Sequence, residues 1–393
     1  MRSVEDRVTG QRLADLALLS GLALGLAILA LFGFFDVRDR VVGHNDFTYT
    51  WAGARTFVDG GNPYEPAAWL GTAERYGTTT PRESVFGYPP WIALAAVPFA
   101  LLPVPIASGI WTFGGMALAA LALRALLRSL APEPPLVHFL SGLALFASQP
   151  GTANMWSGQW TFVLLAVLAM AIVAVREHRR GALLATFLLT TKPQLFLFAF
   201  PALARAAFAR WGLRYLALAA VPPAVAIAIG WLVFPGWLEA WRTKLFEQRL
   251  AVQPPTTLAN GLGDLIGPFG AVIAAVVVLA LVGAGLAFTP RGDAFLAVWL
   301  AISATAPIYS WSYDHLLLIV PLVIATAVVS RRSRRAGVTF AAVAFAAFLI
   351  VPVLLYVVAD ARQSESFNIF VPLAVTVSCI AVLWQQRREV TPA

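Results

Sequence analysis

The stretch LALLSGLALGLAILALFGFF, Leu16–Phe35, carries no charged side chain over its whole length. A helix needs about 20 apolar residues to cross the hydrocarbon core of a bilayer. The stretch therefore predicts a membrane-spanning helix close to the start of the chain. It is too long for the apolar core of a secretory signal and lacks a small-residue cleavage site, so we expect it to be retained.

The composition extends this prediction to the whole chain of 393 residues, which is 59% hydrophobic and only 12% charged. Soluble domains carry about 25% charged residues, so the bilayer is the expected solvent here. Because lipid offers no partner to an open strand edge, the spans should be helices. We predict an all-α polytopic membrane protein of about 11–13 transmembrane helices, folded as one domain over residues 1–393. Besides Leu16–Phe35, the apolar segments are Pro90–Leu102, Ile106–Leu127, Leu136–Phe146, Phe162–Val175, Ala182–Leu203, Tyr215–Phe234, Ala271–Phe288, Ala294–Pro307, Leu316–Val329, Val338–Val358 and Ile369–Trp384.

The net charge of +8 comes from arginines in short clusters between the apolar segments. This placement is typical of cytoplasmic loops in membrane proteins and argues against a nucleic-acid partner. It predicts a cytoplasmic N-terminus and places five polar segments on the outer side. They are Asp36–Tyr88, Gln149–Gln159, Pro235–Pro268, Tyr309–His315 and Asp360–Phe367.

The first of these, the large outer loop over residues 36–88, concentrates polar and aromatic side chains at one membrane surface. Asp46 follows the first span by about ten residues, in Gly43-His44-Asn45-Asp46-Phe47. A carboxylate at a membrane surface can act as a general base. Aspartate is also a favoured helix N-cap, and an aromatic run that could form an interfacial helix follows it, so both interpretations remain open.

Lys192 is one of only two lysines and lies inside the apolar segment Ala182–Leu203, followed by Pro193. The interruption at Thr190–Pro193 predicts two short helices whose connection lies within the membrane. A charge at this depth is costly and indicates function, and its partner would be a carboxylate or a phosphate. The alternative is a lysine that reaches the interface and has no role.

Other polar groups lie where outer segments meet apolar ones. Asp314 and His315 begin an apolar segment as a cap or as an acid–base or phosphate-binding pair, and Gln159 precedes another. Gly60–Tyr64 is a turn by composition, although Asn62 and Tyr64 could line a pocket. Tyr88 is expected at the interface. The sequence contains no HExxH spacing, and its single cysteine, Cys379, excludes a cysteine metal cluster, so we expect no metal.

Together these motifs resemble glycosyltransferase family 87, and they occur in family order between residues 44 and 315. They are Asp46-Phe47…Tyr49…Ala54-Arg55…Gly60-Gly61-Asn62-Pro63-Tyr64, Phe86-Gly87-Tyr88-Pro89-Pro90, Gly158-Gln159, Lys192-Pro193 and Ser310-Trp311…Asp314-His315. One departure is Trp311, which the family pattern would place nearer to the Asp-His pair.

The resemblance implies a fold of the GT-C class and an inverting transfer of a hexose, with mannose expected, from a polyprenyl-phosphate donor to a lipid or glycan acceptor. It implies Asp46 as the general base, and Lys192 and His315 as candidates that stabilise the departing phosphate. It implies no cofactor and no metal. It also implies the cytoplasmic (inner) membrane of a bacterium, with the active site facing the periplasm. The residues implied to bind substrate or donor, Lys192 and His315 among them, are His44, Tyr49, Arg55, Asn62, Tyr64, Tyr88, Gln159, Lys192, Asp314 and His315.

Two alternatives from other functional classes remain. A polytopic transporter or lipid flippase would use Lys192 and Asp314 as an intramembrane site, although the sequence shows no related halves. A scaffold subunit would have no catalysis, and would lose nothing when Asp46 is replaced.

Overall fold

The computed structural model describes residues 4–33, 45–78, 85–130, 134–178, 180–243, 255–288 and 292–388. Within these ranges the chain forms helices and turns and contains no strand, which confirms the predicted all-α fold. The α-helices are α1 (Val4–Gly33), α3 (Phe47–Val58), α4 (Pro66–Tyr76), α5 (Pro90–Ala100), α6 (Val104–Ser129), α7 (Pro135–Ala147), α8 (Gln149–Ser157), α9 (Thr161–Glu177), α10 (Ala199–Trp211), α11 (Leu213–Val233), α13 (Leu258–Ile266), α14 (Gly270–Phe288), α15 (Asp293–Thr305), α16 (Ile319–Ser330), α17 (Arg334–Arg362) and α18 (Phe370–Arg388). The 3₁₀ helices are η1 (Arg180–Thr191), η2 (Pro193–Phe196), η3 (Gly267–Phe269), η4 (Ser312–Leu318) and η5 (Ser366–Ile369).

The described part of the chain contains seven helices long and apolar enough to cross a membrane, and an eighth if the bent pair α8–α9 is one span. The chain is thus a polytopic membrane protein. Helices α5, α7 and α15 are apolar but only 11, 13 and 13 residues long. At about 1.5 Å per residue, such helices are shorter than the hydrocarbon core, which is about 30 Å thick. The predicted 11–13 spans include these three shorter helices in addition to the full-length ones, and that count stays a prediction.

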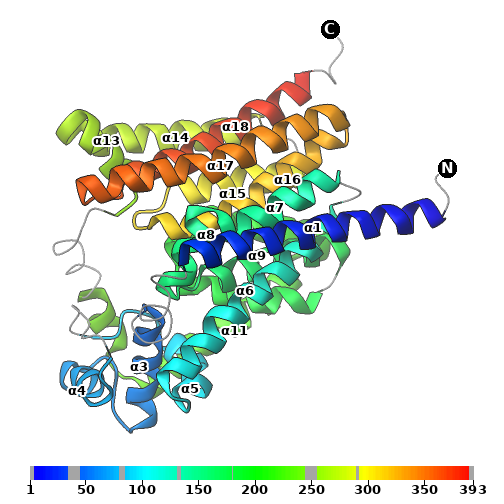
Figure 1. Ribbon diagram of the computed structural model, residues 1–393. Helices are drawn as coiled ribbons and strands as arrows, with labels where there is room; N and C mark the ends of the chain where they lie inside the picture. Colours follow the sequence, from blue (N-terminus) through cyan, green and yellow to red (C-terminus); the bar gives the residue numbers. More distant parts are fainter. Residues whose placement is uncertain are drawn as a thin grey trace.

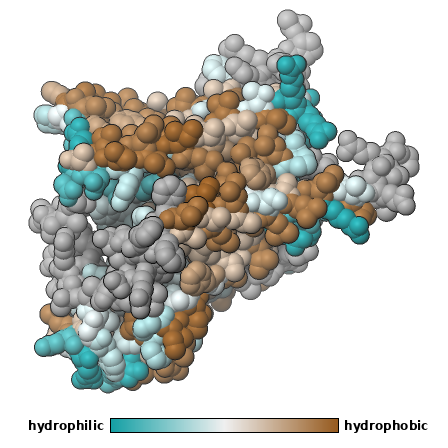
Figure 2. All heavy atoms as spheres, in the orientation of Figure 1, coloured by the Kyte–Doolittle hydropathy of each residue, from teal (hydrophilic) through white to brown (hydrophobic). Residues whose placement is uncertain are grey.

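Arginines from several of the clusters meet around the end of α6, as their contacts show. Arg124 pairs with Asp15 at 2.9 Å, joining α6 to α1. Arg176 and Arg331 both bind Asp293, which joins the ends of α9 and α16 to the start of α15. Hydrophobic atoms cover most of the face between the two ends of the helices (Figure 2). The grouping of these arginines on one side, predicted from the sequence, is confirmed.

The opposite end carries the short helices of the first outer loop, and α3 and α4 lie at the lower left of Figure 1. Two of the predicted outer segments are helical in part. Residues 149–157 form helix α8, because Ser148 accepts a hydrogen bond from the Gly151 amide and caps its start. Within Pro235–Pro268, residues Leu258–Ile266 form helix α13, which ends before Gly267, whose φ is +68°, and Thr257 caps its start by accepting from the Asn260 amide. Both N-caps follow a general preference for Ser and Thr that the charge count does not detect.

Helices α1 and α7 approach each other through glycines. A Cβ on Gly21 would lie 2.1 Å from the Phe139 carbonyl oxygen, and one on Gly142 would lie 2.7 Å from the Leu18 carbonyl oxygen. Small residues at such positions let helix backbones pack closely inside a membrane, where lipid supplies no hydrophobic drive between helices. This contact fixes the first span against the bundle and so fixes where the first outer loop begins.

Candidate active site

A sharp corner between α8 and α9 forms the frame of the site. Helix α8 ends at Gly158, which has a φ of +60°, and α9 leaves at an angle of 120°. A Cβ on Gly158 would lie 2.7 Å from the Asn45 side-chain amide, so both the conformation and the space require glycine. The Trp111 indole donates to the Gly158 carbonyl at 2.9 Å. This corner holds Gln159 at the start of α9, away from the arginine end.

Asp46 is attached to the same corner by its backbone, since its amide donates to the Ser157 carbonyl at 2.8 Å. It immediately precedes α3, but its side chain makes no capping hydrogen bond to that helix. The carboxylate is exposed and instead accepts a hydrogen bond from Nε2 of Gln159. The geometry therefore does not support the N-cap interpretation of Asp46.

Lys192 lies at the break between η1 and η2, as the sequence predicted. The following Pro193 disfavours a helical conformation at Lys192, whose φ of −130° and ψ of 68° lie outside the helical region. The side chain is buried, with 7% of the residue exposed, so it does not snorkel to an interface. Its ammonium donates to Oδ1 of Asp314 at 2.8 Å and to Oε1 of Gln159 at 3.0 Å.

Asp314 is therefore a carboxylate partner of Lys192 within the protein. Its Oδ1 also accepts from the Thr161 hydroxyl at 3.1 Å, and its Oδ2 accepts from the Trp311 amide at 3.1 Å. The residue is thus a cap for η4, which was one of the two interpretations of its position, and it is also the counter-ion of Lys192. The five side chains that these bonds connect, called the Lys192 cluster below, are those of Asp46, Gln159, Thr161, Lys192 and Asp314.

Two members of this environment were not selected from the sequence. Thr161 completes the hydrogen bonds of Asp314, and the Tyr313 ring lies 4.6 Å from the Lys192 ammonium, within range of a cation–π interaction. The Asn154 side chain donates to the Tyr313 carbonyl at 3.0 Å and ties η4 to α8. Both residues lie close in the sequence to Gln159 and Asp314. A search of the sequence for charged residues does not select them.

The two histidines are placed differently. His315 is 2% exposed, and neither of its ring nitrogens has a hydrogen-bond partner among the described residues. It follows Asp314 in η4, but no hydrogen bond joins it to the described members of the Lys192 cluster. His44 lies outside the described residues.

Four predicted substrate-binding residues lie in the turn after α3 and in the aromatic layer around it. The Asn62 side chain accepts from the Tyr64 amide at 3.0 Å, which supports the turn interpretation. Tyr64 is buried and donates its hydroxyl to the Tyr88 carbonyl at 2.5 Å, and burial raises the pKa of this hydroxyl well above its usual value. Tyr88 is half-buried, and its ring centroid lies 6.4 Å from that of Trp160, next to Gln159. Tyr49 packs near Trp69, with ring centroids 6.2 Å apart.

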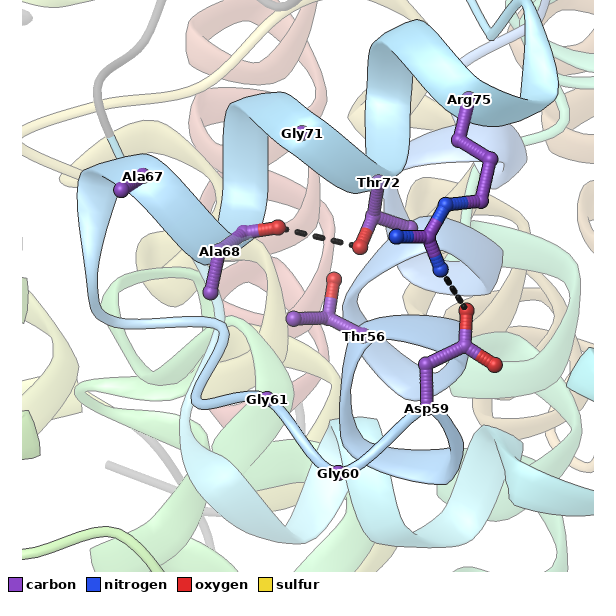
Figure 3. A pocket seen from close by; sticks show the side chains of 9 residues that line it. All are labelled: Thr56, Asp59, Gly60, Gly61, Ala67, Ala68, Gly71, Thr72 and Arg75. Carbon is purple, nitrogen blue, oxygen red and sulfur yellow. Dashed lines mark hydrogen bonds and ion pairs between the residues drawn. The ribbon is translucent and has the colours of Figure 1, made fainter.

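Arg55 has partners within the outer loop and the next helix. It pairs with Asp59 at 2.8 Å, donates to the Ala100 carbonyl at 3.3 Å and lies 4.9 Å from the Tyr76 ring centroid. The nearby Asp59 lines a cavity of about 270 Å³ between α3 and α4, where it pairs with Arg75 at 3.5 Å (Figure 3). Thr56 also lines this cavity and lies ten residues after Asp46, about 15 Å along a helix, so the cavity is separate from the Lys192 cluster.

The arrangement offers an exposed carboxylate held by a buried polar network. Within the described residues, no group of three or more His, Cys, Asp or Glu side chains could hold a metal ion. An exposed carboxylate can accept a proton, and that of Asp46 is hydrogen-bonded to Gln159.

A family model for glycosyltransferase family 87 matches residues 86–310, which is more than half of the chain. The chain belongs to glycosyltransferase family 87. It is therefore a membrane-embedded hexosyltransferase, and membership favours this activity over the transporter and flippase alternatives. For this family 87 enzyme, no curated protein and no solved structure matches. The matched region contains Gln159 and Lys192, whereas Asp46 and Asp314 lie outside it.

Proposed function

We propose that this family 87 enzyme is an inverting glycosyltransferase with Asp46 as its general base. It transfers a hexose, with mannose expected, from a polyprenyl-phosphate donor to a hydroxyl of a lipid or glycan acceptor. The observation that carries the proposal is the exposure of the Asp46 carboxylate, while Gln159, Lys192 and Asp314 behind it are all buried. A base must reach the proton that it removes, and Asp46 is the carboxylate of the cluster that a substrate can reach.

The reaction is a direct displacement at the anomeric carbon. The acceptor oxygen forms a bond to that carbon while the bond from the carbon to the phosphate oxygen breaks. The acceptor proton passes to Asp46, and the electron pair of the broken bond leaves with the polyprenyl phosphate. One displacement inverts the configuration, so one base suffices and no covalent enzyme intermediate forms.

The location of Asp46 fits lipid-linked substrates. It lies at the end of the bundle opposite the arginine clusters, which in cytoplasmic membranes mark the inner side. We therefore place the site at the outer, periplasmic face of a bacterial cytoplasmic membrane. A polyprenyl tail can remain in the bilayer there while the phosphate and sugar reach Asp46.

The test uses membranes containing the protein, radiolabelled polyprenyl-phosphate mannose or glucose, and bacterial membrane lipid as acceptor. The wild-type protein should transfer label to lipid or glycan. Asp46→Asn should lower the rate by about 10²- to 10⁴-fold, because an amide cannot accept the acceptor proton.

Glu74→Gln is the matched control, since it removes an exposed carboxylate from α4 in the same outer loop. Its rate should equal that of the wild type. Wild-type turnover by Asp46→Asn at equal protein yield would disprove the role of the base, and absence of transfer from either donor by the wild type would disprove the donor class.

A further inference from the structure

Gln159 lies between the proposed base and the buried ion pair, and its two amide atoms have different partners. Nε2 donates to the Asp46 carboxylate, and Oε1 accepts from the Lys192 ammonium at 3.0 Å. An amide has one donating end and one accepting end, so these two partners fix which way the Gln159 side chain is turned. The base therefore receives its hydrogen bond from a group that Lys192 orients.

Lys192 is in turn oriented by groups that are buried with it. Its ammonium binds Asp314 at 2.8 Å and lies over the Tyr313 ring, while Asp314 is held by Thr161 and by the Trp311 amide. The side chains of Lys192 and Asp314 are 8% and 3% exposed, so solvent does not compete strongly for them. A lysine with a buried carboxylate partner is already neutralised and is not a free cation that awaits a phosphate.

We propose that Gln159 is a positioning residue that transmits the orientation of the buried Lys192–Asp314 pair to the base Asp46. This inference rests on the function proposed above. It changes the expected role of Lys192 and Gln159 from donor binding to setting the direction of the Asp46 carboxylate. Catalysis then depends on the pair through kcat, whereas affinity for the donor does not.

Three substitutions at Gln159 separate its two hydrogen bonds. Gln159→Met has a similar length and removes both bonds. Gln159→Glu can still accept from Lys192, but an ionised carboxylate cannot donate to Asp46. Gln159→His offers one donor and one acceptor in its neutral ring, separated by one carbon as in the amide, and is the conservative variant.

Each variant is measured in membranes with polyprenyl-phosphate mannose as the varied substrate, and kcat and the donor KM are determined separately. Gln159→Met and Gln159→Glu should lose about 10- to 100-fold in kcat, as expected for loss of a hydrogen bond to a charged group, with the donor KM within about twofold. Gln159→His should recover part of the loss. Gln149→Met is the control, because Gln149 is also a buried amide at this end and binds Ser312 at 3.1 Å without reaching Asp46.

The outcomes distinguish this inference from the proposed function. If Asp46→Asn is inactive but Gln159→Met keeps wild-type kcat, the positioning role is wrong and the base assignment stands. If the donor KM rises while kcat is unchanged, Gln159 binds the donor and the inference is overturned. An equal loss in Gln149→Met would show a general packing effect and would also overturn it. Wild-type turnover by Asp46→Asn would instead disprove the proposed function.

Discussion

Helix α9 has a charged network at each of its ends. One consists of charged groups that bind one another, and the other leads to an exposed carboxylate. The helix is 17 residues long, so the two networks lie about 25 Å apart. At one end Arg176 and Arg331 share Asp293, and both guanidinium groups also donate to backbone carbonyls at the end of α6. At the other end the Lys192–Asp314 pair is connected through Gln159 to the exposed Asp46.

The arginine network is closed and follows the helix dipoles. Its cations lie at the C-terminal ends of α9 and α16, and its carboxylate lies in the first turn of α15, the arrangement that the dipoles favour. The two guanidinium groups bind Asp293 and also donate to the carbonyls of Ser129 and Leu130. This network stabilises the joints between helices. The Lys192 cluster also contains an ion pair, but it ends at Asp46, which is exposed. An exposed carboxylate can be reached by a substrate, as a catalytic base must be.

The largest effect should follow from breaking the Lys192–Asp314 pair. Lys192→Met leaves a buried carboxylate without its cation, which typically costs about 3–5 kcal/mol of stability. Activity per folded molecule should fall by at least about 10-fold, because Gln159 loses its orienting partner. Thermal unfolding in detergent and the transfer assay measure the two effects separately.

Two companion variants sharpen this result. Lys192→Met combined with Asp314→Asn removes both charges, so most of the stability should return while activity stays low. Lys192→Arg should recover activity in part at best, since a planar guanidinium does not replace a compact ammonium in a buried site. An unchanged turnover in Lys192→Met would show that the lysine is a spectator.

Breaking the arginine network should lower stability by less than breaking the Lys192–Asp314 pair, and it should leave turnover unchanged. Arg176→Met leaves Asp293 with Arg331 as a partner, so we expect a loss of about 1–3 kcal/mol in the free energy of unfolding. Turnover per folded molecule should remain that of the wild type, because the network lies about 25 Å from Asp46. A loss of turnover as large as that of Lys192→Met would remove the distinction between the two ends.

The sequence predicted the parts of this comparison that depend on composition. Apolar segments identified the helical membrane fold, and arginine placement identified the arginine network as one group. The predicted count of 11–13 spans exceeds the number of full-length helices because short apolar helices such as α5 and α7 look the same as crossings when only apolar runs are counted. Helix α8 was missed because its sequence, QPGTANMWS, is polar and its signals are caps rather than hydrophobicity.

The site was predicted as a set of residues but not as a network. Lys192 at the break and the need for an anionic partner were predicted from the cost of an intramembrane charge. The choice of Asp314 as that partner was not, because it lies 122 positions away in the sequence and depends on how η4 packs against α9. Thr161 and Tyr313 are ordinary residues in an apolar context, and their roles exist only after folding has brought Lys192 to them.

The assignment of the two networks to opposite membrane faces can be tested by labelling. In a Cys379→Ala background, Glu74→Cys should react with a membrane-impermeant thiol reagent added to intact cells, and Ser333→Cys should not. Both positions are exposed in the structure, so access differs only by the side of the membrane. Neither substitution should alter turnover. Reaction of Ser333→Cys in intact cells would reverse the orientation and move the active site to the cytoplasm.

The smallest effect is expected at Arg55, which the family resemblance assigned to substrate binding. The structure gives its guanidinium three partners in the protein: Asp59, the Ala100 carbonyl and the Tyr76 ring. Its side chain is 26% exposed, so Arg55→Met should cost about 0.5–1 kcal/mol of stability. The donor KM and kcat should each stay within about twofold. Arg55 would then resemble the arginine network, whose charged groups stabilise the fold and do not take part in the reaction. A tenfold rise in the donor KM at unchanged stability would instead show that substrate displaces Asp59 from Arg55, and would extend the functional network beyond the Lys192 cluster.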